Sequence, residues 1–222
     1  VLPSGGLTLE ATTGDVTLGE NARLVATGFS TQIFDKRLDT SGGSISLLAA
    51  NGMINSAAGA VIDVSASPLG GDAGAVVLQA KGAVGLPGTL RGSAANGYAG
   101  GRFAMVTGGA IELDSLAAVL MSNGFNGGVD IRSGQGDLRL TGSLAASTVA
   151  LSADGGLVSV SGLIDASGTK GGDILLFGKR GVDIEGTLVA RGSAADKRGG
   201  RVMLGAGFDP DTVGGVVQTH SI

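Results

Sequence analysis

Six Gly-Gly pairs in this chain are each followed, at once or after one residue, by a short segment of alternating apolar residues. The pairs begin at Gly5, Gly42, Gly100, Gly127, Gly171 and Gly199. Counting an Ala-Gly variant at Ala73, three consecutive copies at 73, 100 and 127 are spaced by 27 residues. A phrase that returns at this interval indicates a repeat architecture, in which each unit buries its apolar side only by stacking on its neighbours.

Glycine makes up 43 of the 222 residues, a content otherwise seen in disordered or fibrous chains. Disorder is excluded because 43% of the residues are hydrophobic and alternate regularly. A collagen-like chain is excluded because glycine does not recur at every third position and there are only 4 prolines. A regular β structure with many tight turns remains.

Charge and cysteine content narrow the function classes. The net charge of −4 argues against nucleic acid or an anionic membrane as the main partner. The absence of cysteine excludes thiol catalysis, cysteine metal sites and disulfides. The sequence shows no signal peptide and opens with Val1 rather than Met, so we expect it to be a fragment of a longer protein.

The best-formed repeat unit, residues 171–198, contains three short alternating segments separated by small turns. Similar triplets recur along the chain and predict a parallel β-helix with three strands per coil, about eight coils and a single domain over residues 1–222. The predicted first strands are Leu7–Leu9, Ile45–Leu47, Val76–Leu78, Phe103–Met105, Val129–Ile131, Val149–Leu151, Ile174–Leu176 and Val202–Leu204. The predicted second strands include Val16–Leu18, Val84–Leu86, Ile111–Leu113, Leu138–Leu140, Val158–Val160 and Val182–Ile184. The predicted third strands include Leu24–Ala26, Ile62–Val64, Leu90–Gly92, Leu144–Ala146, Ile164–Ala166 and Leu188–Ala190.

Alternation along a strand also predicts which side chains are buried. Equivalent residues of successive coils should stack in apolar ladders, with Phe103 over Val76 and Met105 over Leu78. In the two best-matched coils we expect Ile174, Leu176, Val202 and Leu204 inside, and Leu175 and Met203 outside.

The phrases at 164–178 (IDASGTKGGDILLFG) and 199–205 (GGRVMLG) resemble filamentous-haemagglutinin-type exoproteins, the secreted partners of two-partner secretion systems. The pattern "G-x-I-D-A-S-G … G-G-x-I-x-L-x-G" is repeated loosely over nearly the whole chain. The resemblance implies a right-handed parallel β-helix, export through an outer-membrane transporter, and a secreted or surface-exposed adhesin of a Gram-negative bacterium. No N-terminal secretion domain and no C-terminal toxin or processing module is present, so the resemblance places the chain in the shaft.

The corner after the third strand varies most in length. The shortest version is Ala146–Thr148, whereas the longest runs over residues 27–41. Insertions that gather at one corner of a solenoid often mark its binding side, although unselected length variation is the alternative. The candidate contact loop in the long corner consists of Phe29, Ile33, Phe34, Lys36 and Arg37.

A second candidate surface is the outward row of the first strands. Five of its eight positions are apolar on a face that should contact water, which indicates either a covering loop or lateral association with another chain. The apolar members of this row are Val77, Ala104, Ala150, Leu175 and Met203.

Catalytic and metal sites find little support in the sequence. A β-helical polysaccharide-processing enzyme needs clustered outward carboxylates, whereas Asp63 and Asp165 lie several coils apart and Glu112 is expected to form a surface ion pair with Arg139. The single histidine, His220, lacks partners for a zinc site. Asp209 and Asp211 are interpreted as turn residues rather than calcium ligands. We expect no cofactor and no metal.

Basic residues also gather at the variable corner: Lys36, Arg37, Lys170, Lys197 and Arg198. A sulfated-glycan site is one interpretation, but Asp35, Asp39, Asp72 and Asp196 share the corner, and a mixed solvated edge is favoured. The expected function is therefore a non-enzymatic, structural and adhesive shaft. Its expected partners are the outer-membrane transporter during secretion, a glycan or protein on a host or neighbouring cell, and other copies of the chain. The alternatives are a polysaccharide-processing enzyme and a self-assembling extracellular fibre or sheath subunit.

Overall fold

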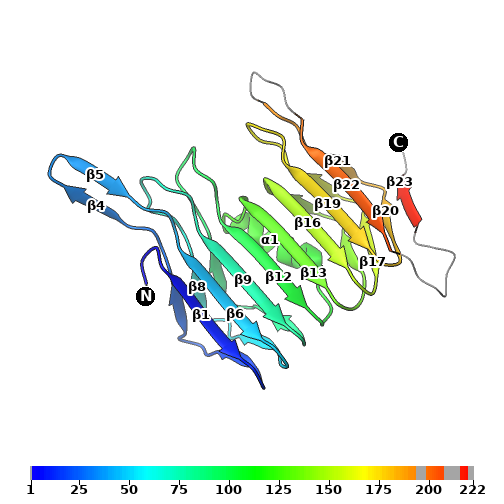
Figure 1. The fold of residues 1–222 in the computed structure, drawn as a ribbon, viewed down its shortest axis with the longest axis horizontal. Coiled ribbons are helices and arrows are strands. Elements are labelled where there is room, and N and C mark those ends of the chain that lie inside the picture. The colour runs from blue at the N-terminus through cyan, green and yellow to red at the C-terminus, as the bar shows by residue number, and fades with distance from the viewer. Residues whose placement is uncertain (1, 194–198, 208–215, 220–222) are drawn as a thin grey trace. The chain divides into compact units, whose positions relative to one another are not determined.

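The computed structural model describes residues 2–193, 199–207 and 216–219. The chain divides into two compact units, one formed by residues 1–107 and 122–127, the other by residues 108–121 and 128–222. Each unit is described below by itself (Figure 1). Both consist of short strands that wind in coils and pair in parallel with the equivalent strand of the next coil, so the predicted parallel β-helix with three strands per coil is confirmed.

The first unit contains four first strands, paired in sequence order. They are β1 (Gly6–Ala11), β6 (Ser44–Ala49), β9 (Ala75–Ala80) and β12 (Arg102–Thr107). The second strands are β2 (Val16–Leu18), β7 (Ile54–Ser56) and β10 (Val84–Gly85). The third strands are β3 (Arg23–Val25), β8 (Val61–Asp63) and β11 (Thr89–Arg91). The remaining strands, β4 (Ser30–Ile33) and β5 (Lys36–Asp39), form an antiparallel hairpin at the first variable corner.

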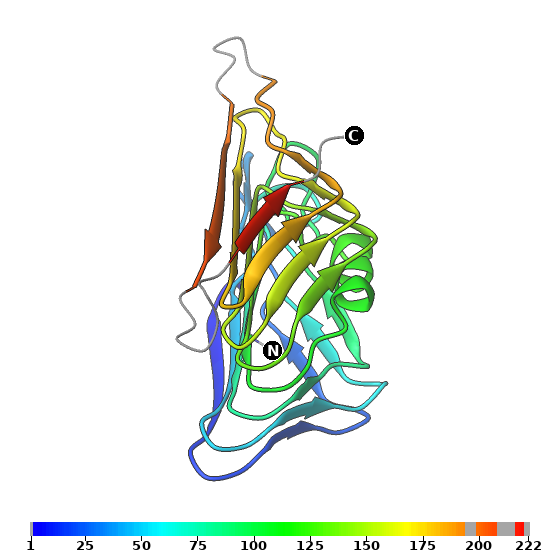
Figure 2. The ribbon, with the colours of Figure 1, turned by 90° about the vertical axis from the view of Figure 1, so that its right-hand side faces the viewer.

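The second unit contains four further first strands, β13 (Gly128–Ser133), β16 (Thr148–Ala153), β19 (Asp173–Gly178) and β22 (Arg201–Ala206). The second strands are β14 (Leu138–Leu140), β17 (Leu157–Val160), β20 (Gly181–Ile184) and β23 (Val216–Thr219). The third strands are β15 (Ser143–Ala145), β18 (Leu163–Asp165) and β21 (Thr187–Val189). Figure 2 shows the successive second strands of this unit, coloured from green to red, on a face separate from that of the first strands.

The core of the first unit is a set of stacked apolar ladders. Ile45 pairs with Val76, which pairs with Phe103, and all three side chains are buried. Met105 stacks on Leu78 in the same way. The predicted ladders are thus confirmed in register and burial. Alternation is a local property of a strand, which explains why the sequence predicts it.

Phe125 completes this core from a segment outside the strands. Its ring is fully buried and meets Phe103 edge to face, with ring centroids 6.0 Å apart and an interplanar angle of 80°. The surrounding segment is fixed by backbone hydrogen bonds, from the Gly92 N–H to the Asn123 carbonyl (2.9 Å) and from the Gly101 N–H to the Gly124 carbonyl (2.9 Å). Phe125 therefore fills the interior although the segment that contains it forms no strand.

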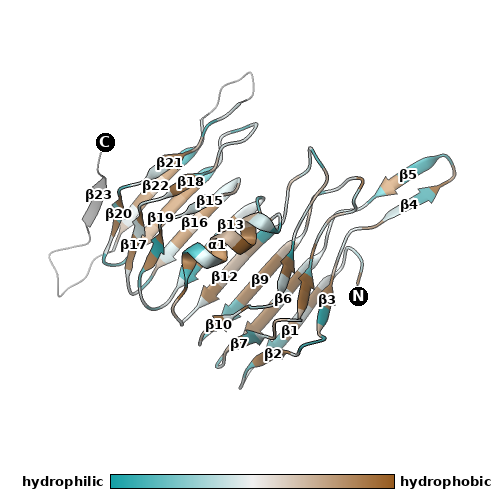
Figure 3. Ribbon diagram, turned by 180° about the vertical axis from the view of Figure 1, so that it is seen from behind, coloured by the Kyte–Doolittle hydropathy of each residue, from teal (hydrophilic) through white to brown (hydrophobic). Residues whose placement is uncertain are grey.

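The predicted second strand Ile111–Leu113 is wrong, because the helix α1 (Leu113–Ser122) begins there. Leu113, Ala117 and Leu120 are buried at the spacing of one helical face. Figure 3 shows hydrophobic and hydrophilic residues together on this helix. The three residues Ile-Glu-Leu fit a strand and a helix equally well, and the longer helical period of residues 113–120 decides the outcome.

The predicted burial of Val202 is also wrong, since this side chain is 44% exposed. Its neighbour in the coil before, Ile174, is fully buried, as is Leu176. Among the described residues, β22 pairs with β19 on one side only, so no next coil covers its inward row. Leu204 is accordingly half-buried, while Leu175 and Met203 face outward as predicted.

Candidate contact surfaces

The long corner at residues 27–41 folds as the two-stranded hairpin β4–β5. Its register pairs Ser30 with Asp39, Thr31 with Leu38, and Ile33 with Lys36. A further pair at the base is closed by the Thr40 N–H, which donates to the Phe29 carbonyl (2.9 Å). The predicted contact loop is therefore an ordered element that projects from the first coil (Figure 1).

The hairpin has two chemically distinct faces, because residues opposite one another in antiparallel strands point to the same side. The polar face carries Ser30, Gln32, Arg37 and Asp39. The apolar face carries Phe29, Thr31, Ile33, Lys36, Leu38 and Thr40. Figure 3 shows both hydrophilic and hydrophobic residues on this hairpin. Ile33 and Leu38 are 53% and 50% exposed, so the described part of the unit leaves the apolar face open.

Asp39 anchors the polar face to the corner of the next coil. Its carboxylate accepts hydrogen bonds from the Ser67 hydroxyl (3.0 Å) and from Arg37 Nε (2.8 Å). A hydrogen bond from Ser30, with those from Arg37 and Ser67, lowers the pKa of Asp39. Arg37 of the candidate contact loop is therefore ion-paired with Asp39 of the same hairpin.

Phe34 forms the tip of the hairpin and is 93% exposed. Its φ of 55° places a bulky residue in the left-handed region, where Gly, Asn or Asp is usual. Such strain, of order 1–3 kcal/mol, persists where the surroundings or a function require it. The side chain makes almost no contact within the chain, so packing gives no reason for a phenylalanine here.

The outward apolar row is present in both units. In the first unit Val77 lies beside Ala104 in the pairing of β9 with β12. In the second, Leu175 lies between Ala150 and Met203. Val77 and Met203 are exposed, and the other three are half-buried. Val106 and Phe177 extend this row and were not predicted from the sequence: each is exposed and lies two residues beyond a row member, Val106 after Ala104 and Phe177 after Leu175. The observed strands are longer than the predicted ones and include both residues.

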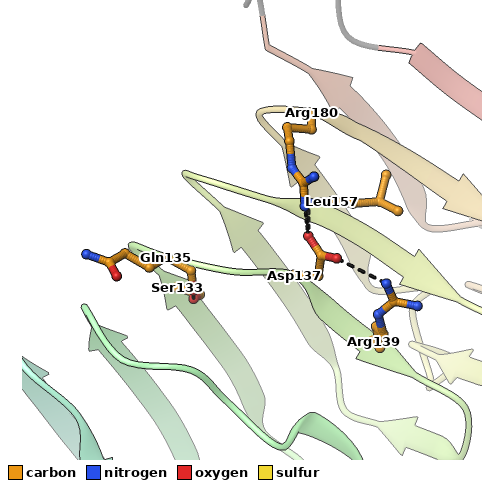
Figure 4. A network of polar contacts seen from close by, with 6 residues as sticks. All are labelled: Ser133, Gln135, Asp137, Arg139, Leu157 and Arg180. Carbon is orange, nitrogen blue, oxygen red and sulfur yellow. Dashed lines mark hydrogen bonds and ion pairs between the residues drawn. The ribbon is translucent and has the colours of Figure 1, made fainter.

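Charged side chains on the second unit form a network centred on Asp137 (Figure 4). Its carboxylate accepts hydrogen bonds from the Leu157 N–H (3.0 Å), from Arg139 Nη2 (3.1 Å) and from Arg180. The expected ion pair between Glu112 and Arg139 is therefore wrong: Arg139 pairs with Asp137, two residues away on the same corner. The bond from Leu157, followed by those from Arg139 and Arg180, lowers the pKa of Asp137.

An equivalent contact occurs in the first unit, where the Asp15 carboxylate accepts a hydrogen bond from the Met53 N–H of the next coil (2.8 Å). Asp15 and Asp137 occupy equivalent places, each following a glycine and preceding a second strand. Asp114 on α1 likewise accepts from the backbone of Thr141 (2.8 Å) and Gly142 (2.9 Å). A hydrogen bond from the Thr141 hydroxyl is the largest cause of its lowered pKa. These carboxylates tie neighbouring segments together.

The Asp63 and Asp165 carboxylates lie on third strands of different units. Asp63 accepts the Ser65 N–H (3.0 Å) and has Arg91 at 3.9 Å. Asp165 accepts the Ser167 N–H (2.8 Å) and borders an open groove of about 610 Å³ that Arg191 also lines. Hydrogen bonds from Ser167 lower the pKa of Asp165. A general acid needs a raised pKa, so this arrangement favours an ionised structural carboxylate.

Several predicted residues lie outside the described part of the chain, namely Asp196, Lys197, Arg198, Asp209, Asp211 and His220. Within the described residues, no group of three or more His, Cys, Asp or Glu side chains is placed to hold a metal ion. The described part of the chain likewise contains no helix of the length and hydrophobicity that crossing a membrane requires.

The chain matches no known family model, and comparisons with curated proteins and with solved structures find no similar protein.

Proposed function

We propose that this chain is a non-enzymatic shaft segment of a secreted, filamentous-haemagglutinin-like surface protein, and that it contacts partners through its variable corner. The observation that carries the proposal is the contrast between corners. The corner at residues 146–147 is minimal, whereas the corner at 27–41 builds a hairpin with exposed Phe29, Ile33 and Phe34. A scaffold of stacked strands needs no such element, and exposed aromatic groups are what interaction sites use.

The carboxylates support a structural role. Asp15, Asp114 and Asp137 each accept backbone N–H groups from a neighbouring segment. None of the four aspartates with a shifted pKa has it raised, as a proton donor to a glycosidic oxygen would require. This arrangement favours a scaffold over the polysaccharide-processing alternative.

The shaft assignment is tested by insertion of the 222 residues, in frame, between two coils of a filamentous-haemagglutinin-type exoprotein. We expect the hybrid to reach the cell surface in a manner that depends on its outer-membrane transporter, because a continuous β-helix keeps the parallel ladders paired across both junctions. A globular insert of equal length serves as control. Failure of export with this chain, under conditions in which the unmodified exoprotein is exported, contradicts the proposal.

Adhesion is tested with beads that carry the purified chain, washed over surfaces coated with mucin or with heparin. We expect retention on at least one coating, reduced when Phe34 and Ile33 are replaced by serine and unchanged for Arg180→Ala on the other unit. Retention equal to that of beads without the protein contradicts the adhesive role. Release of new reducing ends from soluble polysaccharides by the chain contradicts the non-enzymatic one.

A further inference from the structure

The outer edge of β5 offers unpaired backbone groups. Among the described residues, β4 and β5 pair only with each other. Thr40 is hydrogen-bonded to Phe29 at the base, and bonded pairs alternate along an antiparallel ladder. Lys36 and Leu38 therefore direct their backbone groups toward β4, and those of Arg37 and Asp39 point away from it.

The sequence of this edge is complementary to itself. In an antiparallel pair of two β5 strands related by a twofold axis at Leu38, each Arg37 lies opposite Asp39 of the other copy. The backbone N–H and C=O groups of Arg37 and Asp39 point away from β4. In this register they form hydrogen-bonded pairs with the same groups of the second copy, Arg37 with Asp39 and Asp39 with Arg37. The two leucines meet at the centre on the apolar face. The register thus satisfies the backbone groups and the leucine contact together, and it places each Arg37 beside an Asp39 that already accepts hydrogen bonds from Arg37 and Ser67 of its own copy.

We propose that β5 is a self-association surface, at which it pairs antiparallel with β5 of a second copy about a twofold axis at Leu38. The result is a closed dimer with a four-stranded sheet, whose apolar face combines Ile33 and Leu38 from both copies. Arg37 uses Nε for its own Asp39 and retains the other N–H groups of its fork for the second copy.

The outer edge of β4 lacks this complementarity. Its residues Ser30–Ile33 carry no charge, so a twofold pairing there gains backbone bonds without a charge match. The partner for β5 is therefore a second β5 rather than a β4 edge.

The same register gives Phe34 a place. It places the tip of one hairpin beyond the base pair Phe29–Thr40 of the second copy, toward the corners of the next coils. Two successive corners there carry exposed Leu69 and Tyr98, and the Tyr98 hydroxyl lies 3.2 Å from where a Cβ on Gly70 would be. Phe34, which has almost no contact within its own chain, then packs against apolar side chains of the second copy.

A single introduced cysteine tests the axis directly, because the natural chain has none. Opposite residues in an antiparallel pair have Cβ atoms about 4.5–5.5 Å apart, close to the span of a disulfide. We expect Leu38→Cys to form a disulfide-linked dimer under mild oxidation. Ile33→Cys is the control, since Ile33 is equally exposed on the same face but far from its symmetry mate. Equal cross-linking of the two variants, or none of Leu38→Cys, overturns the proposal.

A second test blocks each edge in turn. Arg37→Pro removes an outward N–H from β5, and Gln32→Pro removes one from β4, with no ladder bond of the hairpin lost in either. Sedimentation equilibrium should show a wild-type dimer that Arg37→Pro weakens by about tenfold or more, while Gln32→Pro leaves it unchanged. A wild-type monomer overturns the proposal. So does association that Arg37→Pro does not weaken, or that Gln32→Pro weakens as much.

Discussion

Single aspartates join successive coils at their corners. Asp137 illustrates the principle, since its carboxylate bonds to Arg139 in its own coil, to Leu157 in the next and to Arg180 in the one after. A charged acceptor bonded to a backbone N–H is among the stronger hydrogen bonds in proteins. One residue thereby restrains three consecutive turns of the second unit.

Asp137→Asn should lower the free energy of unfolding by about 1–2 kcal/mol, because it weakens three hydrogen bonds to a carboxylate. Urea denaturation measures the change. Asp154→Asn is the matched control, as Asp154 is more exposed and forms a single ion pair with Arg132 (2.7 Å). An equal loss in the two variants would show that the network adds nothing beyond a surface ion pair.

The Asp137 effect should depend on pH. The pKa of this group is lowered in the folded chain from its ordinary value of 3.8. Its contribution is therefore fully present above that value and is lost as the pH falls through the lowered one. Denaturation curves of the wild type and Asp137→Asn should differ at neutral pH and converge under more acidic conditions. A constant difference down to the acid limit contradicts this linkage.

At the scale of elements, glycines permit close contact between the backbones of successive coils. A Cβ on Gly156 would lie 1.8 Å from the Gly136 carbonyl oxygen. The equivalent corner of the first unit repeats this contact, with 2.1 Å between a Cβ on Gly52 and the Gly14 carbonyl oxygen. Stacked corners of this kind leave no room for a side chain.

Gly156→Ala should consequently destabilise the fold by about 2–4 kcal/mol, since the backbone must shift to admit the methyl group. Thermal unfolding followed by circular dichroism provides the measurement. Gly19→Ala should be within about 0.5 kcal/mol of wild type, because nothing lies within 4 Å of its added Cβ. Comparable stability of both variants would refute the close-contact argument.

The hairpin is an element that the scaffold should not require. Replacement of residues 30–39 by Gly-Gly joins the bonded pair of Phe29 and Thr40 through a tight turn. We expect an unchanged far-ultraviolet β signal and an unfolding midpoint close to that of the wild type. The deletion removes the bond from the Ser67 hydroxyl to Asp39 but keeps the bond from the Ser67 N–H to the Thr40 carbonyl (3.2 Å). If the shortened chain fails to fold, the hairpin is a structural cover and its proposed contact role is wrong.

At the scale of the molecule, two first strands have one unpaired edge each. Among the described residues, β1 and β22 are each paired on one side only. The inward row of β22 is partly exposed at Val202. Such edges recruit strands of other chains, and head-to-tail pairing between two different edges produces open-ended assemblies rather than closed dimers.

Val202→Asp should therefore reduce open-ended assembly, because it places a charge in the inward row on which the strand of another copy would pack. Sedimentation velocity over a concentration series distinguishes this assembly, which grows continuously, from the closed dimer at β5. Val106→Asp, at an equally exposed outward position, is the control. Unchanged growth in Val202→Asp would show that β22 is not an assembly edge.

The sequence by itself determined the repeat and its interior. All eight predicted first strands are present, and the ladder from Val76 to Phe103 has the predicted register. Alternation and turn glycines are local signals, and stacking of similar units converts local agreement into a global fold. The same reasoning identified the corner at residues 27–41 and the outward row as candidate surfaces.

The tertiary structure decided what depends on distant neighbours. Leu113 begins a helix, and residues 111–112 form no strand, because the packing of Leu113, Ala117 and Leu120 outweighs a three-residue alternation. Val202 is exposed because no described strand covers β22, whereas its equivalent Ile174 is buried. The Asp137 network joins residues 43 positions apart, and the hairpin acquires a polar and an apolar face only once its register is fixed. The exposure of Val202, the Asp137 network and the two hairpin faces are not encoded in a local pattern, since each depends on which segments pair with one another.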